Sequence, residues 1–563
     1  MKRFSAILYS KYILYIVIAM FATAVFCYIY GYYILNPVYT DWLLADAHYD
    51  LSQHYLGWVA YRQSEWTFPI GYTDYLAYPT QTSVIFTDSI PCFAVLFKLL
   101  SPVLPDEFQY FGLWGLLCFI LQGVLSARII SRFTDNKAII VCTGIFFVFI
   151  PAVIRKMFGH TALAGQWIIL LALDRIFDHE SYATRKKYIA WMLIGGLAVS
   201  IHMYFVVMCG IILIGYCVAD SIINRRVRDG ALLLLLYLLS VGIVIAILGG
   251  FSKGPVVTTD GLGIFSLNLN GLFNSQGWSC LIPSFPLLEG QFEGFIYLGV
   301  GGILLLLVAV IQILLRKKIR VTALGKQPVF VAMLLISFLT FIFALSPTVT
   351  LNDRVIVQVP LPEFLLKCWS IFRSTGRIGW VLVYIILLSS LFVLCKTFNN
   401  RTAFIFLFIC TAIQVYDIHR ELFDRHIRYS QKVEYETVFR DAYAGEKWSQ
   451  LGNNDEIKHI VFTQTVTGAD LYAFTDWALS HGKTVSNFYF ARPIDEEIDV
   501  NLRKALLEPS CEEMFIFFPS NVKECARYDL NYYIIGNNII GYRDVIDGMD
   551  LLPDNYFYNN LNQ

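Results

Sequence analysis

Acidic and histidine side chains are concentrated in a short polar segment between the first apolar stretch of the chain and a long series of others. Within it, Asp46, Asp50 and His54 are spaced by four residues, so a helix would present all three on one face. Two carboxylates and an imidazole on one face can bind and release a proton, which indicates a reaction site. The alternative is an amphipathic helix that lies on a bilayer and whose polar side is merely hydrated.

A second set of residues that could do chemistry is basic. Arg155 and His160 belong to one polar turn, and Arg373 and Arg377 stand four residues apart just before an apolar run. The planar guanidinium group matches the geometry of a phosphate. We therefore predict that these four side chains bind an anionic lipid headgroup.

Some of these residues have structural alternatives. The basic residues could pair only with lipid phosphate or with carboxylates, of which Asp353 and Glu363 are the nearest candidates before Arg373. His202, between two apolar runs, could equally be a hydrogen-bonded core residue or a site residue.

Groups that recognise sugars are also present. Glu293 and Tyr297 stand where a long polar loop leads into an apolar run. Carboxylates accept hydrogen bonds from sugar hydroxyl groups, and aromatic rings stack on sugar rings. We predict that these two residues, together with His54, Trp58 and His202, contact a sugar or its acceptor.

The signatures of familiar soluble enzymes are missing from the sequence. We find no phosphate-cradling glycine-rich loop with its lysine, no zinc-ligand spacing and no Gly-x-Ser-x-Gly turn. The formal net charge is zero, which gives no indication of a nucleic-acid partner. We expect no bound cofactor and no metal site, although a divalent metal ion stays open.

The elements that would hold these residues are mostly apolar. Of the 563 residues, 57% are hydrophobic, 16% are aromatic and only 15% are charged. Runs of nearly membrane-spanning length recur along most of the chain, so we expect a polytopic α-helical membrane protein. Most of the twelve cysteines lie in or near these runs and are interpreted as small core residues.

About eleven transmembrane helices are predicted. They cover residues 12–35, 108–127, 138–154, 162–176, 188–201, 204–222, 231–248, 295–315, 329–345, 378–394 and 402–415. With the N-terminus inside, every compact basic cluster of the connections falls on the cytoplasmic side. The run from Ser89 to Leu104 is short, and a crossing there would move every later cluster outside. We therefore predict that it lies in the membrane interface.

The remaining outer part is predicted to be a soluble domain. Residues 1–416 form the membrane domain, whose first outer loop, 36–104, carries the acidic segment, and residues 417–563 have the composition of one small domain. Strands are predicted at 460–465, 514–518 and 532–542, the last with a hairpin turn at 536–538, and a helix at 497–507. Cys511 and Cys525 could form a disulfide or be two free thiols.

At this point the pattern resembles the GT-C superfamily of membrane glycosyltransferases. A short inside N-terminus, one span, an acidic outer loop, interfacial helices, about ten more spans and an external C-terminal domain are shared. Six motifs are similar to an uncharacterised bacterial family assigned to that fold. They are DLSQHYLGW at 50–58, TDSIP at 87–91, QYFG at 109–112, GHTALAGQW at 159–167, EGFIYLG at 293–299 and FRSTGR at 372–377. The likeness covers roughly Met1 to Asp417.

The resemblance implies transfer of a sugar, with inversion, from a polyprenyl-phosphate donor to an acceptor outside the cytoplasmic membrane. Asp50 matches the superfamily's general base, with Asp46 as the substitute. Many relatives have adjacent acidic residues here, whereas this chain separates the two by three residues, so the base stays open between them. The departing lipid phosphate would be neutralised by Arg373, Arg377, Arg155 or His160. Neither a metal nor a covalent intermediate is required.

A carrier or flippase for a lipid-linked sugar would share the basic outer residues. Carriers tend to show internal repeats and ionisable residues deep in their spans, whereas the charges here collect at one face. We therefore predict an enzyme. The expected partners are a polyprenyl-phosphate sugar, membrane lipid and a cell-envelope glycan or polymer. The expected location is the plasma membrane, with the N-terminus inside and the C-terminal domain outside.

Overall fold

The chain forms two compact units. The computed structural model describes residues 2–45, 49–177, 185–251, 261–315, 328–433, 442–464, 466–490, 495–518, 525 and 527–553. Unit 1 comprises residues 1–36, 110–244 and 256–432, and unit 2 comprises residues 37–109, 245–255 and 433–563. The first outer loop and the C-terminal residues thus belong to the same unit.

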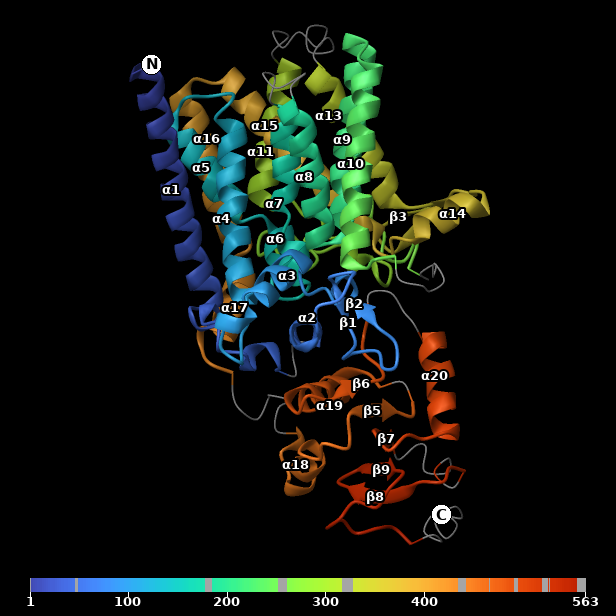
Figure 1. The fold of residues 1–563 in the computed structure, drawn as a ribbon. Helices are drawn as coiled ribbons and strands as arrows, with labels where there is room; N and C mark the ends of the chain where they lie inside the picture. Colours follow the sequence, from blue (N-terminus) through green and yellow to red (C-terminus); the bar gives the residue numbers. More distant parts are fainter. Residues whose placement is uncertain are drawn as a thin grey trace. The chain divides into compact units, whose positions relative to one another are not determined.

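Unit 1 is a bundle of apolar helices (Figure 1). Its helices are α1 Lys2–Tyr30, α4 Phe111–Ile130, α5 Lys137–Val148, α6 Pro151–Lys156, α7 Trp167–Ile176, α8 Arg185–Ile201, α9 Met203–Asn224, α10 Val227–Leu248, α11 Val300–Leu315, α13 Pro328–Leu345, α15 Trp380–Thr397, α16 Asn400–Asp417 and α17 His419–Ser430. Each predicted crossing overlaps one or two of these helices, which confirms a polytopic α-helical membrane protein.

Helix length and composition alone account for fewer than eleven crossings in the described residues. In the described residues, seven helices are long and apolar enough to cross a membrane, or eight if the bent pair α16 and α17 is one span. The predicted eleven also include α7, α8 and α11, whose 10, 17 and 16 residues fall short of the ~20 that a crossing needs. The count of eleven therefore stays a prediction.

Small residues let the helices of unit 1 approach closely. Gly123 of α4 faces Gly144 of α5, and a Cβ atom added at Gly144 would lie 3.1 Å from the Gly123 carbonyl oxygen. On α9, a Cβ at Gly215 would lie 2.5 Å from the Ile336 side chain of α13. Close packing of this kind replaces the hydrophobic effect as the force that joins helices in a bilayer.

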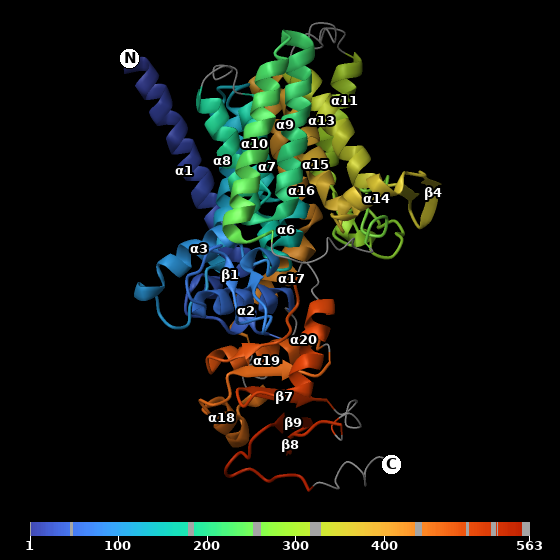
Figure 2. The same cartoon turned by 45° about the vertical axis from the view of Figure 1, so that its right-hand side comes forward.

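A hairpin and a short helix connect α13 to α15, and short 3₁₀ helices form several polar turns of unit 1. The strands β3 (Thr348–Leu351) and β4 (Arg354–Gln358) form an antiparallel hairpin, which the helix α14 (Glu363–Ser370) follows. Both project sideways from one end of the bundle (Figures 1 and 2). Three single-turn 3₁₀ helices occupy Thr161–Ala164, Gln291–Gly294 and Thr375–Gly379.

Unit 2 contains a five-stranded sheet. The strands β5 (His459–Phe462), β6 (Thr484–Val485), β7 (Glu513–Phe517), β8 (Asn531–Ile535) and β9 (Asn538–Tyr542) are ordered β6-β5-β7-β9-β8. β5 runs parallel to β6 and β7, whereas β9 is antiparallel to β7 and β8. The helices are α18 Glu446–Gly452, α19 Gly468–Ser480 and α20 Asp495–Leu507. The predicted small α+β domain is confirmed.

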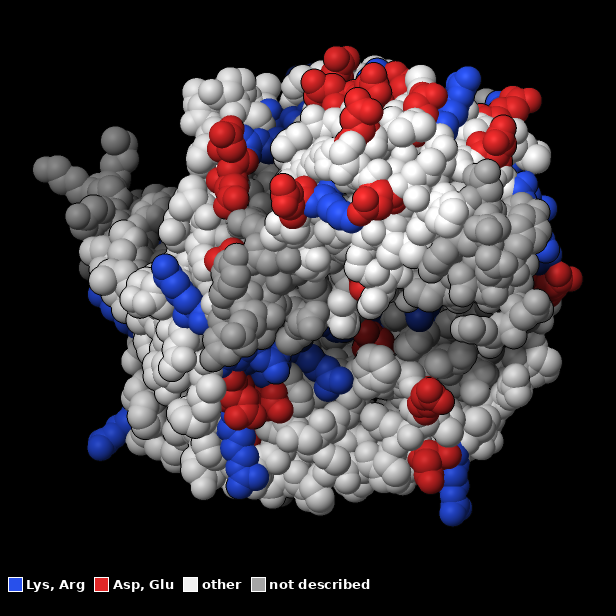
Figure 3. Space-filling model, turned by 90° about the horizontal axis from the view of Figure 1, so that it is seen from below, with Lys and Arg blue, Asp and Glu red and all other residues white. Residues whose placement is uncertain are grey.

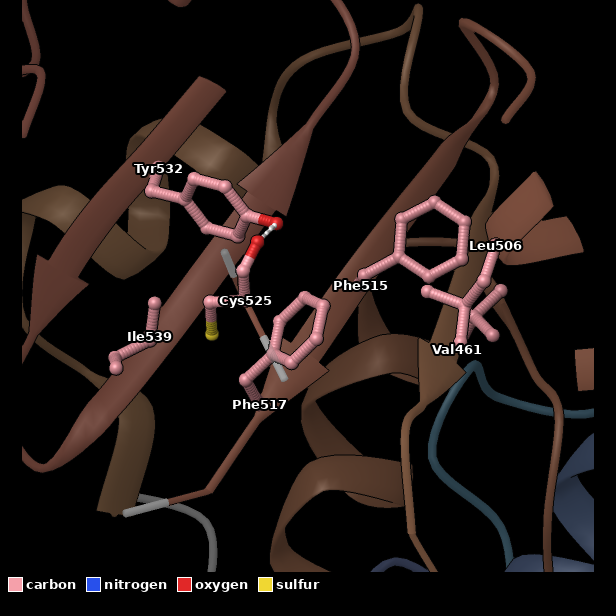
Figure 4. Packing of buried hydrophobic residues seen from close by; sticks show 7 residues of the cluster. All are labelled: Val461, Leu506, Phe515, Phe517, Cys525, Tyr532 and Ile539. Atoms are coloured by element: carbon pink, nitrogen blue, oxygen red, sulfur yellow. Dashed lines mark hydrogen bonds between the residues drawn. The ribbon is translucent and has the colours of Figure 1, made fainter. Parts of the chain in front are cut away.

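The apolar face of this sheet packs into a local core. Val461 of β5, Phe515 and Phe517 of β7 and Ile539 of β9 are buried there together with Cys525 (Figure 4). The predicted hairpin turn is confirmed between β8 and β9, where Gly536 has a positive φ of 61°. Cys511 and Cys525 are both free thiols, Cys511 exposed and Cys525 buried.

The first outer loop is folded against the C-terminal residues. It contains α2 (Tyr49–Gln63), the strand pair β1 (Tyr72–Thr73) and β2 (Thr82–Ser83), and α3 (Pro91–Leu99). Gln63 of α2 donates to the Leu479 carbonyl oxygen of α19 at 3.0 Å. The backbone N–H of Val485 in β6 donates to the Tyr75 carbonyl oxygen at 2.8 Å. The composition-based boundary at residue 417 separates two parts of the sequence that these contacts join.

Most of the described surface seen in Figure 3 carries no charge. Asp and Glu side chains gather along the upper edge of this view, and Lys and Arg side chains are more scattered.

Gly57 generates a test of how α2 is held in the loop. A Cβ atom there would lie 2.5 Å from Thr87 Cβ and 2.7 Å from Ser89 Oγ, and Ser89 is fixed by a 2.7 Å hydrogen bond to the His54 carbonyl oxygen. We expect Gly57→Ala to cost about 1–3 kcal/mol by overpacking and to lower the thermal unfolding midpoint of the purified protein.

The matched control is Gly242→Ala on α10, where an added Cβ meets nothing within 4 Å. Alanine is the better helix former, so this change should leave the midpoint unchanged or raise it. Equal midpoints for both variants would contradict the close packing at Gly57.

Candidate functional site

A buried carboxylate binds basic side chains from two distant segments. The side chain of Glu293 is 8% exposed, and its Oε2 accepts hydrogen bonds from Lys156 Nζ at 2.7 Å and from Arg377 Nε at 2.8 Å. Its Oε1 lies 3.4 Å from Nε2 of His160. We call Lys156, His160, Glu293 and Arg377 the charged cluster; all four belong to unit 1.

Short turns bring these residues together. Lys156 is the last residue of α6, which starts at Pro151 and is followed by Phe158 with a positive φ of 58°. Glu293 and Arg377 lie on separate 3₁₀ turns. A Cβ atom at Gly376 would lie 2.5 Å from Gly294 Cα, so the two turns can approach only because residue 376 is glycine. A Cβ atom at Gly294 would lie 2.4 Å from the Ser266 carbonyl oxygen, so this position also requires glycine. The glycines of the EGFIYLG and FRSTGR motifs therefore have a packing role.

The environment of Glu293 keeps it ionised. Burial by itself raises the pKa of Glu293, but the charge of Arg377, the hydrogen bond with His160 and the charge of Lys156 outweigh it and hold the pKa well below its ordinary value. The stabilisation by this carboxylate is therefore fully present above its ordinary pKa of 4.5 and is lost progressively as the pH falls below it.

Positive charge is in surplus around the cluster. Arg155 precedes Lys156, and its guanidinium carbon lies 4.4 Å from the centroid of the Phe295 ring. Glu421 cannot compensate it fully, because its carboxylate is bonded to Arg425 at 2.6 Å. Among the described residues, the cations Arg155, Lys156 and Arg377 thus surround the single carboxylate Glu293. Such an arrangement suits a phosphate oxyanion.

Aromatic side chains contact two arginines of this region, and His202 is bonded to the backbone of one of these aromatic residues. His202 precedes α9, and its Nδ1 accepts the backbone N–H of Tyr204 at 3.2 Å, so it is an N-cap. The Tyr204 ring lies 5.1 Å from the Arg377 guanidinium carbon, and its hydroxyl accepts the Ser374 N–H at 2.7 Å. The exposed Arg373 places its guanidinium carbon 4.6 Å from the Phe265 ring centroid.

Tyr297 is part of a second buried polar centre. Its ring is fully buried, and its hydroxyl donates to Oδ2 of Asp417 at 2.7 Å. The same carboxylate accepts the Val300 N–H at 3.0 Å and the Ser279 hydroxyl group. In this structure Tyr297 therefore ties the start of α11 to the end of α16. Its predicted contact with a sugar stays a prediction.

In unit 2, the predicted base stands at the start of α2. Asp50 is partly buried in the first turn of that helix, and the neighbouring Tyr49 ring stacks on Tyr472 of α19 at a centroid distance of 6.1 Å. Burial raises the pKa of Tyr472, and the negative charge of Asp50 adds to the rise. Asp46, the predicted substitute, lies outside the described residues.

His54 and Trp58 of α2 are buried inside the outer loop. Trp58 is fully buried, and its indole N–H donates to the Phe108 carbonyl oxygen at 2.9 Å. His54 is 1% exposed. Both side chains therefore lie in the packing that fixes α2 in the loop, and their predicted contacts with a substrate stay predictions.

The fold brings some of the predicted site residues together. Arg155, His160, Glu293 and Arg377 come together in unit 1. Lys156 is not among the predicted site residues, although it donates to Glu293 at 2.7 Å. Its place between Arg155 and His160 is the signal that could have indicated it. The described residues contain no group of three or more His, Cys, Asp or Glu side chains that could hold a metal ion.

Two family models match the sequence. Residues 19–419 match the model described as Domain of unknown function (DUF6311), and residues 447–543 match the DUF6311 C-terminal domain. No curated protein matches the chain in sequence.

Solved structures also resemble the chain. One is the Archaeoglobus fulgidus oligosaccharyltransferase in its apo form, at 13% identity and a TM-score of 0.45, covering 95% of this chain and 75% of that one. Its complex with zinc and sulfate matches at 12% identity, a TM-score of 0.40, and 95% and 74% coverage. ArnT from Cupriavidus metallidurans, also apo, matches at 12% identity, a TM-score of 0.45, and 94% and 97% coverage.

The charged cluster generates a stability prediction. Glu293→Gln keeps the size of the side chain but leaves Lys156 and Arg377 buried without their counter-ion. Breaking a buried pair in this way costs about 3–5 kcal/mol. We expect a large fall in the thermal unfolding midpoint at pH 7, and partial recovery with added inorganic phosphate, which can replace the lost negative charge.

The matched control is Glu421→Gln, which removes an i,i+4 pair whose Glu421 side chain is 27% exposed. Pairs of this kind contribute about 0.3–0.5 kcal/mol, so the midpoint should hardly change. A similar small effect for both variants would contradict the central place of Glu293.

Proposed function

We propose that this chain, which belongs to the family described as Domain of unknown function (DUF6311), is a membrane glycosyltransferase. It transfers a sugar from a polyprenyl-phosphate donor to a glycan or polymer acceptor outside the cytoplasmic membrane. The observation that supports this best is the gathering of the basic side chains Lys156, His160 and Arg377 at one buried position of the described structure, because a lipid-linked donor presents a phosphate to its enzyme.

The charged cluster is the proposed phosphate site. When the bond between the anomeric carbon and the phosphate oxygen breaks, the phosphate gains negative charge. Lys156 and Arg377 are held by Glu293 at 2.7 and 2.8 Å, so they need not reorganise during the reaction. Fixed cations of this kind stabilise the charge that develops in the transition state. Arg155, Arg373 and His160 would complete the contact with the donor.

Asp50 is the proposed general base. The hydroxyl oxygen of the acceptor attacks the anomeric carbon from the side opposite to the phosphate, and the hydroxyl proton passes to the Asp50 carboxylate. One C–O bond forms as another breaks, and the bonding electrons leave with the phosphate, so the anomeric configuration inverts. The position of Asp50 in the first turn of α2, beside the Tyr49 and Tyr472 rings, supports a fixed base with aromatic surfaces for the acceptor. Asp46 is the alternative base.

The proposed orientation follows the basic connections. The N-terminus lies inside, and the acidic loop and the C-terminal domain lie outside, where lipid-linked sugars and envelope polymers meet.

The base is tested by removing its basicity at constant size. General-base catalysis contributes typically about 10²- to 10⁴-fold. We expect Asp50→Asn to lower turnover of a radiolabelled polyprenyl-phosphate sugar by about that factor, with the protein level and the donor KM near those of the unaltered chain. The control is Asp106→Asn, an exposed carboxylate of the same unit, which should keep full turnover.

Other outcomes have distinct meanings. Full turnover in Asp50→Asn combined with loss in Asp46→Asn would assign the base to Asp46. Full turnover in both would overturn the role of the loop. If the unaltered chain binds the donor but releases no polyprenyl phosphate, the carrier reading replaces the enzyme.

A further inference from the structure

An unusual apolar surface lies on the segment between α13 and α15. The side chains of Leu351, Val355, Ile356, Val357, Phe364 and Leu365 are between 41% and 72% exposed, although all are large and apolar. We call these six residues the lateral apolar surface. They come from the β3–β4 hairpin and from α14, which project sideways from the bundle (Figures 1 and 2).

Both faces of β4 are apolar and exposed. Val355 pairs with Thr350 and Val357 with Val349, two neighbours on β3 that point to opposite faces. Val355 and Val357 therefore lie on opposite faces, with Ile356 as the extra residue of a β-bulge between them, at 51%, 49% and 53% exposure. A hairpin in water normally covers one face with its own core, and an isolated two-stranded hairpin is only marginally stable. We therefore expect the apolar side chains of β4 to contact an apolar environment outside the chain.

The hairpin is nevertheless held firmly on its other strand. Thr350 of β3 is fully buried, and its hydroxyl oxygen accepts the Gln291 side-chain N–H at 2.6 Å. Its carbonyl oxygen accepts the Leu269 N–H at 3.0 Å. At the turn, Asn270 donates to the Asn352 side chain at 2.6 Å. The exposure of β4 is therefore a fixed feature of unit 1.

α14 is also attached to the helix bundle. Trp369 packs on Phe343 of α13 at a centroid distance of 5.3 Å. On the remaining part of this short helix, Phe364 is 72% exposed and Leu365 is 45% exposed. The helix is thus attached to the end of α13 and turns apolar side chains outward.

The position of the segment identifies what covers it. α13 is a candidate membrane span that ends at Leu345, and β3 starts at Thr348. The two residues between them, Ser346 and Pro347, can span at most about 10 Å, and the polar interface of a bilayer is roughly 5–8 Å thick on each side. Phe338 and Ile342, on the last turns of α13, are 63% and 46% exposed. The lateral apolar surface therefore continues the lipid-facing side of a span into the interface.

We propose that the β3–β4 hairpin and α14 lie in the outer interface of the membrane, with the lateral apolar surface in contact with phospholipid. The free backbone groups of the edge strand β4 need hydrogen-bond partners, so the hairpin stays at headgroup level, where water and headgroups supply them. This inference does not depend on the proposed transfer reaction.

The test places a fluorescent label at Ile356 through Ile356→Cys, in the full chain whose exposed cysteines Cys368 and Cys511 are replaced by serine. The chain is reconstituted singly in phospholipid nanodiscs, with or without a lipid that carries a nitroxide near its headgroup. We expect emission at shorter wavelength and strong quenching by the nitroxide lipid. A label at Phe364, through Phe364→Cys, should behave alike and tests the second element independently.

The control label is at Asn537, through Asn537→Cys, in the exposed turn of the β8–β9 hairpin. Aqueous iodide should quench it, and the nitroxide lipid should not. Iodide quenching at Ile356 as strong as at Asn537, without quenching by the lipid, would overturn the proposal. A label at Ile356 shielded from both quenchers would also overturn it, because a protein surface would then cover the hairpin.

Discussion

The interaction on which unit 1 depends is the buried ion pairing of Glu293 with Lys156 and Arg377. These residues are 137 and 84 positions away from Glu293 in the sequence, so one carboxylate fixes three segments that no local structure brings together. Cations buried without a partner are costly, so the pairing with Glu293 stabilises the approach of these segments. The segment order and the two glycine turns therefore form one arrangement, in which basic side chains gather around this carboxylate.

Unit 2 shows a similar dependence on distant contacts. α2 carries Asp50, yet the helix is held by Thr87 and Ser89 on one side and by residues of the C-terminal part, such as Leu479, on another. The C-terminal domain thus has a physical role even without catalytic groups of its own, because it fixes the helix on which the proposed base stands. Tyr472 extends this role, since its ring lies against Tyr49, next to Asp50.

Much of the architecture could be predicted from the sequence because its signals are local. Apolar runs located the helices, and Gly536 marked the β8–β9 turn because a positive φ favours glycine. Short elements could not be predicted from the sequence. β6 has only two residues, and the pairing of these residues with β5 depends on the rest of the sheet. The helices α18 and α19 were not predicted either. The composition-based boundary at residue 417 could not reveal that the outer loop packs on the C-terminal part.

The residue types of the candidate site could be predicted from the sequence, but the pairing of these residues with one another could not. Charge and spacing selected Arg155, His160, Glu293 and Arg377, but no sequence rule pairs residues so far apart, so Glu293 was assigned to a sugar and not to cations. His202 illustrates the same limit, because a histidine before a helix gives no sign in sequence that its ring caps the next turn.

The measurement that tests the phosphate-binding role most directly compares two lipids of equal chain length, polyprenyl phosphate and the neutral polyprenol, in binding to the purified full-length chain. Two charge-assisted hydrogen bonds contribute about 3–6 kcal/mol together, so the phosphate should bind at least about 100-fold more tightly. Equal affinities for the two lipids would contradict a phosphate site in the charged cluster, and with it the proposed use of a lipid-phosphate donor.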